Sequence, residues 1–386
     1  MSQVMPIQVQ LVSTAEPDCR DGSMMRYGQL VRRALAEFAA DQVVVRETSL
    51  APRQAFLSLL PPVLRTPVRY LIIAARAHRL LRARTGAIVH LLDGSHAYAF
   101  KGLRPEDTPL VVTVHDLIPA LRVRGRFGPV KSGRCGSLVV RCALDGLARA
   151  SAIAADSAST SRDLLDVVGL PPDIVRVVPL AVQMPPAFAA RTDEPVPEPY
   201  LLHVAGNNTF YKNRCGVIDI FTEVRRGTDV GLKMAGAPPD KALTAKVAAS
   251  GCADAIEFLS NVPEDRLAQL YRQAALLVFP SLYEGFGWPP LEAMSHGCPV
   301  VCSNVASLPE VVGDAALLAA PADVAAMARH CLNVLGDASL RRRLSDAGRR
   351  NVRRFTLDRM ASGLMETYRC ALERFQRARH GHAHSG

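Results

Sequence analysis

Short apolar runs rich in valine and isoleucine recur along the whole chain, and segments of helix length separate them. The runs fall at residues 7–12, 43–45, 88–92, 110–114, 153–155, 174–178, 200–204, 232–235, 276–279, 299–302 and 316–318. A strand that is apolar over its full length is typical of a parallel sheet covered by helices on both faces. The sequence therefore predicts an α/β protein with doubly wound, Rossmann-like parallel sheets.

A proline-rich interval divides this pattern into two halves. Six prolines lie between residues 179 and 199, an interval that can continue neither a helix nor a central strand. The 386 residues are enough for two domains of ordinary size, ~100–200 residues each. We predict an N-terminal domain over residues 1–185 and a C-terminal domain over residues 186–360. A final helix over residues 361–386 is expected to pack back toward the N-terminal domain and to end in a frayed tail.

Composition excludes several classes of protein. Hydrophobic residues make up 49% and charged residues 21% of the chain, which does not fit a disordered or collagen-like sequence. The N-terminal stretch lacks the basic segment of a signal peptide, and the most apolar run, residues 70–75, is far shorter than the ~20 residues of a membrane-spanning helix. The nine cysteines are scattered without a C-x-x-C pair, so neither a disulfide framework nor a zinc site is indicated. We expect a cytoplasmic protein.

Positive charge is concentrated in the first half of the chain. Residues 1–187 carry 23 Lys and Arg against 15 Asp and Glu, whereas the remaining residues carry 23 against 21. Between Glu47 and Asp93, arginines alternate with leucines and isoleucines and no acidic residue intervenes, which is typical of a basic amphipathic surface. These arginines are Arg53, Arg65, Arg69, Arg76, Arg79, Arg82 and Arg84. The pattern favours a peripheral position at the cytoplasmic face of a membrane. The alternative is arginine richness on solvated helices.

The most informative segment is FPSLYEGFGWPPLEAMSHGCPVVCSNVASLPEVV, residues 279–312. A predicted strand ends there in a glycine-bearing loop, and a Pro-Pro pair opens a helix. The backbone amides of residues 285–287, Leu291 and Glu292 are therefore expected beyond the strand, where they can bind an anion. Glu284 on the loop and Glu292 on the helix can accept hydrogen bonds from different hydroxyls of one ligand. The pattern favours a polyol with an anionic group.

This segment resembles the donor motif of the retaining glycosyltransferases of family 4, in which seven residues separate two glutamates. The likeness extends through EAMSHGCPVVCSNVASLPEVVGDAALL and, in outline, over nearly the entire chain. It implies the GT-B fold, in which two Rossmann-like domains face a cleft. It also implies that Glu284 binds the donor sugar and that Glu292 holds the ribose. Gly285, Phe286 and Gly287 would line the sugar and the phosphate. The alternative is a pair of solvated glutamates beside a loop.

A second segment, HVAGNNTFYKNRCGVIDIF, consists of a predicted strand, a polar turn and a helix over residues 203–221. By the same resemblance, Lys212 neutralises the charge that grows on the departing nucleoside diphosphate, and it is a catalytic candidate. Gly206 and Asn207 would border the donor. Relatives often carry an arginine soon after the strand glycine, and this chain has asparagines instead. Arg214 or the asparagines are candidates to replace it, and a solvated helix charge is the alternative for Arg214.

In the first half, LVVTVHDLIP places His115 and Asp116 where a strand meets its loop, the end at which open α/β sheets bind ligands. Family 4 often has the same His-Asp-x-x-Pro text. The resemblance implies a catalytic His115 that hydrogen-bonds the reacting sugar or helps the acceptor. The alternative is a histidine that caps the strand end, and for Asp116 we expect a structural role.

The N-terminal segment RDGSMMRYGQLVRRAL resembles the glycine-rich acceptor-side turn of the family, with its usual pair of glycines reduced to Gly22. Arg26 and Tyr27 agree with that pattern, so these three residues are candidates for the acceptor side. The intervening methionines could accommodate a lipid or a sugar, although methionine more often fills a core.

The resemblance to family 4, together with these features, implies a retaining hexosyltransferase that uses a nucleotide diphosphate sugar, with mannose slightly favoured, and needs no metal and no cofactor. The acceptor would be a glycan or a polyprenyl-diphosphate-linked saccharide in the synthesis of cell-surface polysaccharide. The alternatives are a pseudo-enzyme scaffold that binds a nucleotide sugar, and an epimerase or phosphorylase on the same fold. Aromatic residues are only 5% of the chain, so stacking on nucleic-acid bases is not expected.

Overall fold

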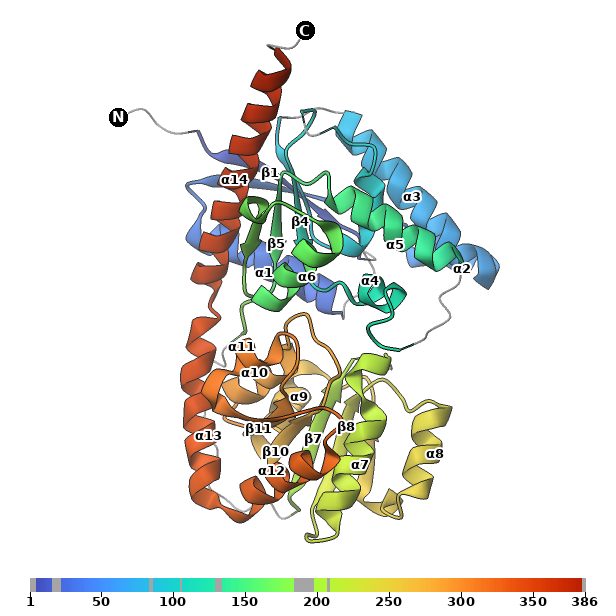
Figure 1. Cartoon of the computed structure of the whole chain (residues 1–386), viewed down its shortest axis with the longest axis vertical. Coiled ribbons are helices and arrows are strands. Elements are labelled where there is room, and N and C mark those ends of the chain that lie inside the picture. The colour runs from blue at the N-terminus through green and yellow to red at the C-terminus, as the bar shows by residue number, and fades with distance from the viewer. Residues whose placement is uncertain are drawn as a thin grey trace. The chain divides into compact units, whose positions relative to one another are not determined.

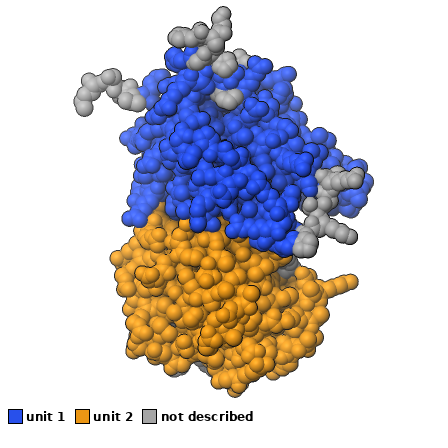
Figure 2. Space-filling model, viewed as in Figure 1, with its two compact units in different colours: residues 1–181, 357–386 blue, residues 182–356 orange. Residues whose placement is uncertain are grey.

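The computed structural model describes residues 5–15, 22–82, 86–104, 106–128, 134–183, 198–206 and 209–383. The chain divides into two compact units, of which unit 1 comprises residues 1–181 and 357–386 and unit 2 comprises residues 182–356 (Figure 2). In each unit, helices alternate with parallel strands along the chain (Figure 1). The predicted α/β class with two parallel sheets is confirmed.

Unit 1 is built on a six-stranded parallel sheet with the order β2-β1-β3-β4-β5-β6. The strands are β1 (Ile7–Ser13), β2 (Val43–Ser49), β3 (Ile88–Leu91), β4 (Leu110–Val114), β5 (Ala152–Ala155) and β6 (Val175–Val177). The helices are α1 (Ser23–Phe38), α2 (Gln54–Ser58), α3 (Pro62–Arg82), α4 (Ile118–Val123), α5 (Arg134–Leu147), α6 (Ala158–Val168) and α14 (Leu357–Ala383). Every residue of β3, β4 and β5 is buried, because helices cover both faces of the sheet centre.

The last helix belongs to unit 1 although it follows unit 2 in the chain. α14, red in Figure 1, packs beside α1 and contacts β3, β4, β5 and β6. Gly363 allows a close approach, since a Cβ at this position would lie 3.1 Å from Cγ1 of Val178. The hydrophobic residues that α14 buries are Met360, Ala361, Leu364, Met365, Tyr368 and Ala371. Unit 1 therefore completes its core with a segment from the other end of the chain.

Unit 2 has a second six-stranded parallel sheet with the order β12-β11-β10-β7-β8-β9. The strands are β7 (Tyr200–Ala205), β8 (Gly231–Gly236), β9 (Ile256–Leu259), β10 (Leu276–Phe279), β11 (Val300–Ser303) and β12 (Ala316–Ala319). The helices are α7 (Arg214–Arg225), α8 (Lys241–Ala249), α9 (Glu264–Gln273), α10 (Trp288–Ser295), α11 (Leu308–Val312), α12 (Val324–Gly336) and α13 (Ala338–Asn351). Only β9 was not predicted, because this edge strand is short, partly exposed and interrupted by Glu257.

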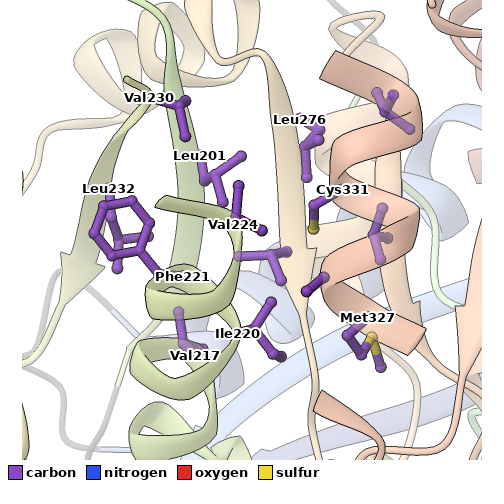
Figure 3. Close-up of a cluster of buried hydrophobic side chains, with 14 of the residues drawn as sticks. Leu201, Val217, Ile220, Phe221, Val224, Val230, Leu232, Leu276, Met327 and Cys331 are labelled. Atoms are coloured by element: carbon purple, nitrogen blue, oxygen red, sulfur yellow. The ribbon is translucent and has the colours of Figure 1, made fainter. Parts of the chain in front are cut away.

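A hydrophobic cluster between the sheet and helices α7 and α12 holds unit 2 together (Figure 3). At helical spacing, α7 contributes Val217, Ile220, Phe221 and Val224. Leu201 and Leu232 come from the sheet, and Met327 and Cys331 come from α12. Phe221 is fully buried, so we expect its truncation to alanine to cost ~3–5 kcal/mol. This packing fixes the strands whose carboxyl ends carry the loops of the site.

Candidate active site

Two residues far apart in the sequence, Lys212 and Glu284, meet beyond the carboxyl ends of β7 and β10. Lys212 Nζ lies 2.8 Å from Oε1 and 2.9 Å from Oε2 of Glu284, so both carboxylate oxygens accept from one ammonium group. The two side chains are only 14% and 8% exposed. The ammonium group also lies over the rings of Tyr211 and Phe279, 5.2 Å and 5.5 Å from their centroids. Low exposure and two hydrogen bonds make this a well-defined ion pair.

The two loops that carry this pair are tied to each other. A short 3₁₀ turn follows β7 and ends at Lys212. The Leu282 amide donates to the carbonyl of Tyr211 in that turn at 2.7 Å. Asn213 then adopts a left-handed backbone conformation with φ of 50°, and its side-chain amide donates to the carbonyl of Pro280 at 2.9 Å. The turn is therefore held against the loop that follows β10.

The loop after β10 depends on one glycine and one serine. Gly287 precedes α10 with φ of 109°, and a Cβ there would lie 2.8 Å from Cδ2 of Leu308. Any other residue would be strained at this position. The hydroxyl of Ser307 lies 2.9 Å from the carbonyl oxygen of Glu284 and 2.7 Å from that of Phe286. Residues 285–287 are buried, so the predicted donor loop is held rigidly.

The second predicted glutamate is oriented by a neighbouring helix. Leu291 and Glu292 lie in α10 and are buried. Glu292 Oε2 accepts a hydrogen bond of 2.9 Å from the hydroxyl of Tyr271, which belongs to α9. This contact fixes one oxygen of the carboxylate that was predicted to hold a ribose.

The remaining predicted donor residues differ in how the structure places them. Gly206 is exposed just after β7, and Asn207 lies outside the described residues. Arg214 is the first residue of α7 and is buried, so its interpretation as a solvated helix charge is wrong. Its guanidinium lies over the Phe258 ring, 5.9 Å from the centroid, and donates to the carbonyl of Pro238 at 3.4 Å. Burial lowers the pKa of Arg214.

In unit 1, His115 lies just after β4 and makes hydrogen bonds through both ring nitrogens. Nδ1 lies 2.6 Å from Oδ2 of Asp156, and Nε2 lies 2.9 Å from the carbonyl oxygen of Leu92. The Tyr27 ring packs edge-on against the imidazole, with centroids 4.6 Å apart. Burial alone would lower the pKa of His115, but Asp156, with smaller contributions from Asp93 and the Leu92 carbonyl, raises the pKa to about 9.

Sequence reasoning did not identify Asp156. This residue follows the buried strand β5 and is itself buried. Its position could have indicated it, because a polar residue at the carboxyl end of a buried parallel strand is a candidate for a ligand-binding site. Asp116, the residue after His115, accepts a hydrogen bond of 2.9 Å from the Ile118 amide and so stabilises the turn before α4.

The three candidates on the acceptor side are divided between surface and core. Tyr27 is buried, and its hydroxyl lies 2.7 Å from Oγ1 of Thr113, so this side chain supports the core and is not exposed to an acceptor. Arg26 is half-buried on α1. Gly22 lines a hollow beside the carboxyl ends of β1 and β3. Other residues that line this hollow are Met24, Met25, Arg69, Asp93 and His96.

Two family models match the two halves of the chain. The one described as Glycosyltransferase Family 4 matches residues 28–184, and the one described as Glycosyl transferases group 1 matches residues 198–337. The O-antigen chain mannosyltransferase B of Escherichia coli is 47% identical over 114 residues, which are 30% of this chain and 30% of that protein. The MMP alpha-(1->4)-mannosyltransferase of Mycolicibacterium hassiacum is 31% identical over 223 residues, 56% of this chain and 54% of that protein. The matched regions span less than two thirds of the length of these relatives.

The fold also resembles solved structures over almost its whole length. The sucrose-phosphate synthase of Thermosynechococcus elongatus matches with a TM-score of 0.75 and 20% sequence identity, covering 94% of this chain and 98% of that one. At this identity the likeness concerns the fold alone. The predicted GT-B architecture, with two parallel-sheet domains, is confirmed.

Proposed function

Because the chain belongs to the glycosyltransferases of family 4, we propose that it transfers a hexose, with retention of configuration, from a nucleotide diphosphate sugar to a glycan or a lipid-linked saccharide. Mannose is the favoured sugar, since both relatives described above are named mannosyltransferases. The relative from Escherichia coli is named for the O-antigen chain, which supports a role in the synthesis of cell-surface polysaccharide.

The observation that carries this proposal is the buried pair of Lys212 and Glu284 beyond the carboxyl ends of β7 and β10. A ligand in this position can present phosphate oxygens to the ammonium group and sugar hydroxyls to the carboxylate. The start of α10 behind Gly287 adds backbone amides that favour negative charge. One site thus offers partners for both halves of a sugar diphosphate.

The proposed reaction needs no protein nucleophile. The bond between an acceptor hydroxyl oxygen and the anomeric carbon forms while the bond from that carbon to the diphosphate oxygen breaks, and the hydroxyl proton passes to a diphosphate oxygen. The transition state resembles an oxocarbenium ion. Lys212 stabilises the charge that develops on the departing diphosphate. In this proposal that cation replaces a divalent metal, so transfer is expected to continue in EDTA.

A screen of nucleotide sugars tests the proposal. Thermal shift and donor hydrolysis would be measured for the wild type, Lys212→Ala and Glu284→Ala. Lys233→Ala and Glu257→Ala are matched controls, because they form a Lys–Glu ion pair elsewhere in unit 2, between β8 and β9, with 3.0 Å between Lys233 Nζ and Glu257 Oε2. We expect one donor class to raise the melting temperature of the wild type and of both controls, with a weaker shift for the two site variants. No shift with any donor, or equal shifts in all five proteins, would contradict the proposal.

We further propose that the enzyme works at a membrane surface through α2 and α3. Among the described residues, no helix is both long and apolar enough to span a bilayer. Large apolar side chains on this segment are exposed, with Leu59 at 82%, Val63 at 79% and Leu71 at 70%. Arg79 and Arg82 are exposed at the end of α3. Apolar and basic groups together suit an anionic lipid surface, at about 1 kcal/mol per arginine.

Vesicle co-sedimentation tests this part of the proposal. Phosphatidylglycerol vesicles would be compared with phosphatidylcholine vesicles for the wild type, an Arg79→Ser/Arg82→Ser variant and an Arg342→Ser/Arg343→Ser control on α13. The wild type and the control should bind the anionic vesicles, and the α3 variant should bind them several-fold more weakly. Equal binding by all three proteins would exclude α3 as the docking surface.

A further inference from the structure

We infer that Asp156 is a positioning residue that keeps His115 protonated on both ring nitrogens, so that this histidine serves transfer as a hydrogen-bond donor and not as a base. The inference rests on the proposed function for its role in transfer. Its structural part concerns unit 1 alone and can be tested on the free protein.

The argument starts from the two partners of the imidazole. The Asp156 carboxylate lies 2.6 Å from Nδ1 and the Leu92 carbonyl oxygen lies 2.9 Å from Nε2. An ionised carboxylate and a carbonyl oxygen can only accept hydrogen bonds. Burial raises the pKa of Asp156, while the charge and the hydrogen bond of His115 act in the opposite direction. With the Asp156 carboxylate ionised, both contacts are satisfied only if both nitrogens of His115 carry a proton, which makes the ring an imidazolium.

The Asp156 carboxylate has no competing structural task among its described contacts. It lies between β5 and α6, where an acidic residue often caps the helix. Ser157 performs that task here, because its side-chain oxygen accepts from the Thr160 amide at 3.0 Å. Asp156 is 2% exposed, so an unpaired charge at this position would be costly. The pair with His115 compensates that cost.

The other titratable groups around His115 also favour the doubly protonated ring. Asp93, after β3, adds negative charge near the ring, while burial and His115 itself lower the pKa of His90 on β3 to about 3 and keep it neutral. The remaining groups make their own contacts: Tyr27 with Thr113, His96 with Asp93, and Asp116 with the Ile118 amide. Burial lowers the pKa of His115, but Asp156, Asp93 and the Leu92 carbonyl together outweigh burial and raise the pKa to about 9.

A doubly protonated His115 has no lone pair with which to take a proton from an acceptor hydroxyl. The proton of that hydroxyl therefore goes to an oxygen of the departing diphosphate, as the new bond to the anomeric carbon forms and the bond to the diphosphate breaks. The Nε2–H group, which now donates to the Leu92 carbonyl, is the group with which His115 can donate a hydrogen bond to a substrate oxygen. His115 is unchanged at the end of the step.

The first arm of the test is an NMR titration of His115 in the full chain, assigned by comparison with His115→Gln. We expect the wild-type midpoint well above the ordinary ~6.5. The midpoint of Asp156→Asn should lie lower by roughly one pH unit or more. Asp163→Asn is the matched control, because Asp163 is also buried, belongs to α6 and pairs with Arg126. A wild-type midpoint near that of free histidine would overturn the inference, and this arm needs no substrate.

The second arm is the pH dependence of kcat and KM once a donor is found. In Asp156→Asn, activity should fall at neutral pH and recover as the pH is lowered, because protonation restores the second N–H of His115. His115→Gln, which keeps an amide donor, should retain at least ~10-fold more activity than His115→Ala. Equal losses in the two His115 variants, or an unchanged pH profile in Asp156→Asn, would overturn the role in transfer. If the wild type uses no donor at all, the proposed function fails while the NMR arm still decides the protonation of His115.

Discussion

The ion pair of Lys212 and Glu284 makes each charge of the candidate donor site depend on the other. With both carboxylate oxygens on the ammonium group, Lys212 is partly neutralised until a ligand separates the two side chains. A nucleoside diphosphate without its sugar gains from Lys212 but offers no sugar hydroxyl to Glu284. In a complete donor, the sugar hydroxyls therefore replace the hydrogen bonds that Glu284 loses when Lys212 turns to the diphosphate.

Glu284→Gln is accordingly expected to strengthen binding of the nucleoside diphosphate product and to slow transfer. Binding of the nucleoside diphosphate should become several-fold tighter, because Lys212 loses its carboxylate partner. Transfer should fall by ~10²–10³, because the charged acceptor for sugar hydroxyls is lost. Calorimetry and initial rates would measure the two effects, with Glu257→Gln as the control. Weaker diphosphate binding by Glu284→Gln would show that the carboxylate does not compete for Lys212.

His115 also gives the folded chain a pH dependence. Its folded pKa, about 9, lies above the ~6.5 of an unfolded histidine. The stabilisation is therefore fully present below about pH 6.5 and is lost as the pH rises through about 9. Burial raises the pKa of Asp156 itself, which offsets part of this stabilisation. We expect Asp156→Asn to lower the free energy of unfolding by about 1–3 kcal/mol at pH 6 and by less at pH 9.5. Urea unfolding at both pH values measures this, with His380→Gln on the exposed end of α14 as control. A difference that does not change with pH would contradict the assignment.

At the scale of single elements, the loop between β10 and α10 shows how backbone conformation positions the site. Gly287→Ala would introduce a Cβ 2.8 Å from Leu308 at φ of 109°. We expect a loss of about 1–3 kcal/mol in the free energy of unfolding, together with weaker donor binding, because the strained loop carries Glu284. Gly336→Ala, at the end of α12 with open space around the position, should change neither. Denaturant unfolding and donor thermal shift would be compared, and an unaffected Gly287→Ala variant would mean that the loop tolerates a rearrangement.

The strands also show where an apolar run in the sequence is informative about secondary structure. Fully apolar runs such as those of β4 and β10 predicted central strands, because burial on both faces requires apolar residues at every position. The edge strand β9 has only one covered side and includes Glu257, so its sequence lacks that pattern. The hydrogen bonds to β8 decide that this segment is a strand.

At the scale of the whole molecule, α14 is attached to unit 1 by a buried polar network. The Tyr368 hydroxyl lies 2.8 Å from Nδ1 of His90, and His90 Nε2 lies 2.9 Å from Oγ1 of Thr113. Thr113 in turn lies 2.7 Å from the hydroxyl of Tyr27. This network joins α14, β3, β4 and α1 in the interior of unit 1.

Tyr368→Phe should therefore destabilise unit 1 selectively. Removal of the hydroxyl leaves a ring nitrogen of the fully buried His90 without its partner, which costs about 1–3 kcal/mol. Hydrogen exchange would show faster opening of β3 and β4, with no change in β7 and β10 of unit 2. Tyr70→Phe on α3 is the control in the same unit. Equal protection of β3 and β4 in wild type and Tyr368→Phe would show that apolar packing alone holds α14.

The sequence by itself determined the elements and the type of chemistry. Apolar runs specify buried parallel strands locally, and the motif around Glu284 and Glu292 predicts a donor loop from adjacent residues. The tertiary structure decided which groups neutralise one another. The contacts of Lys212 with Glu284 and of His115 with Asp156 join residues on different loops, and the burial of Tyr27 depends on strands far from it in sequence. Hydrogen bonding and the pKa depend on distance and burial, which no local pattern encodes.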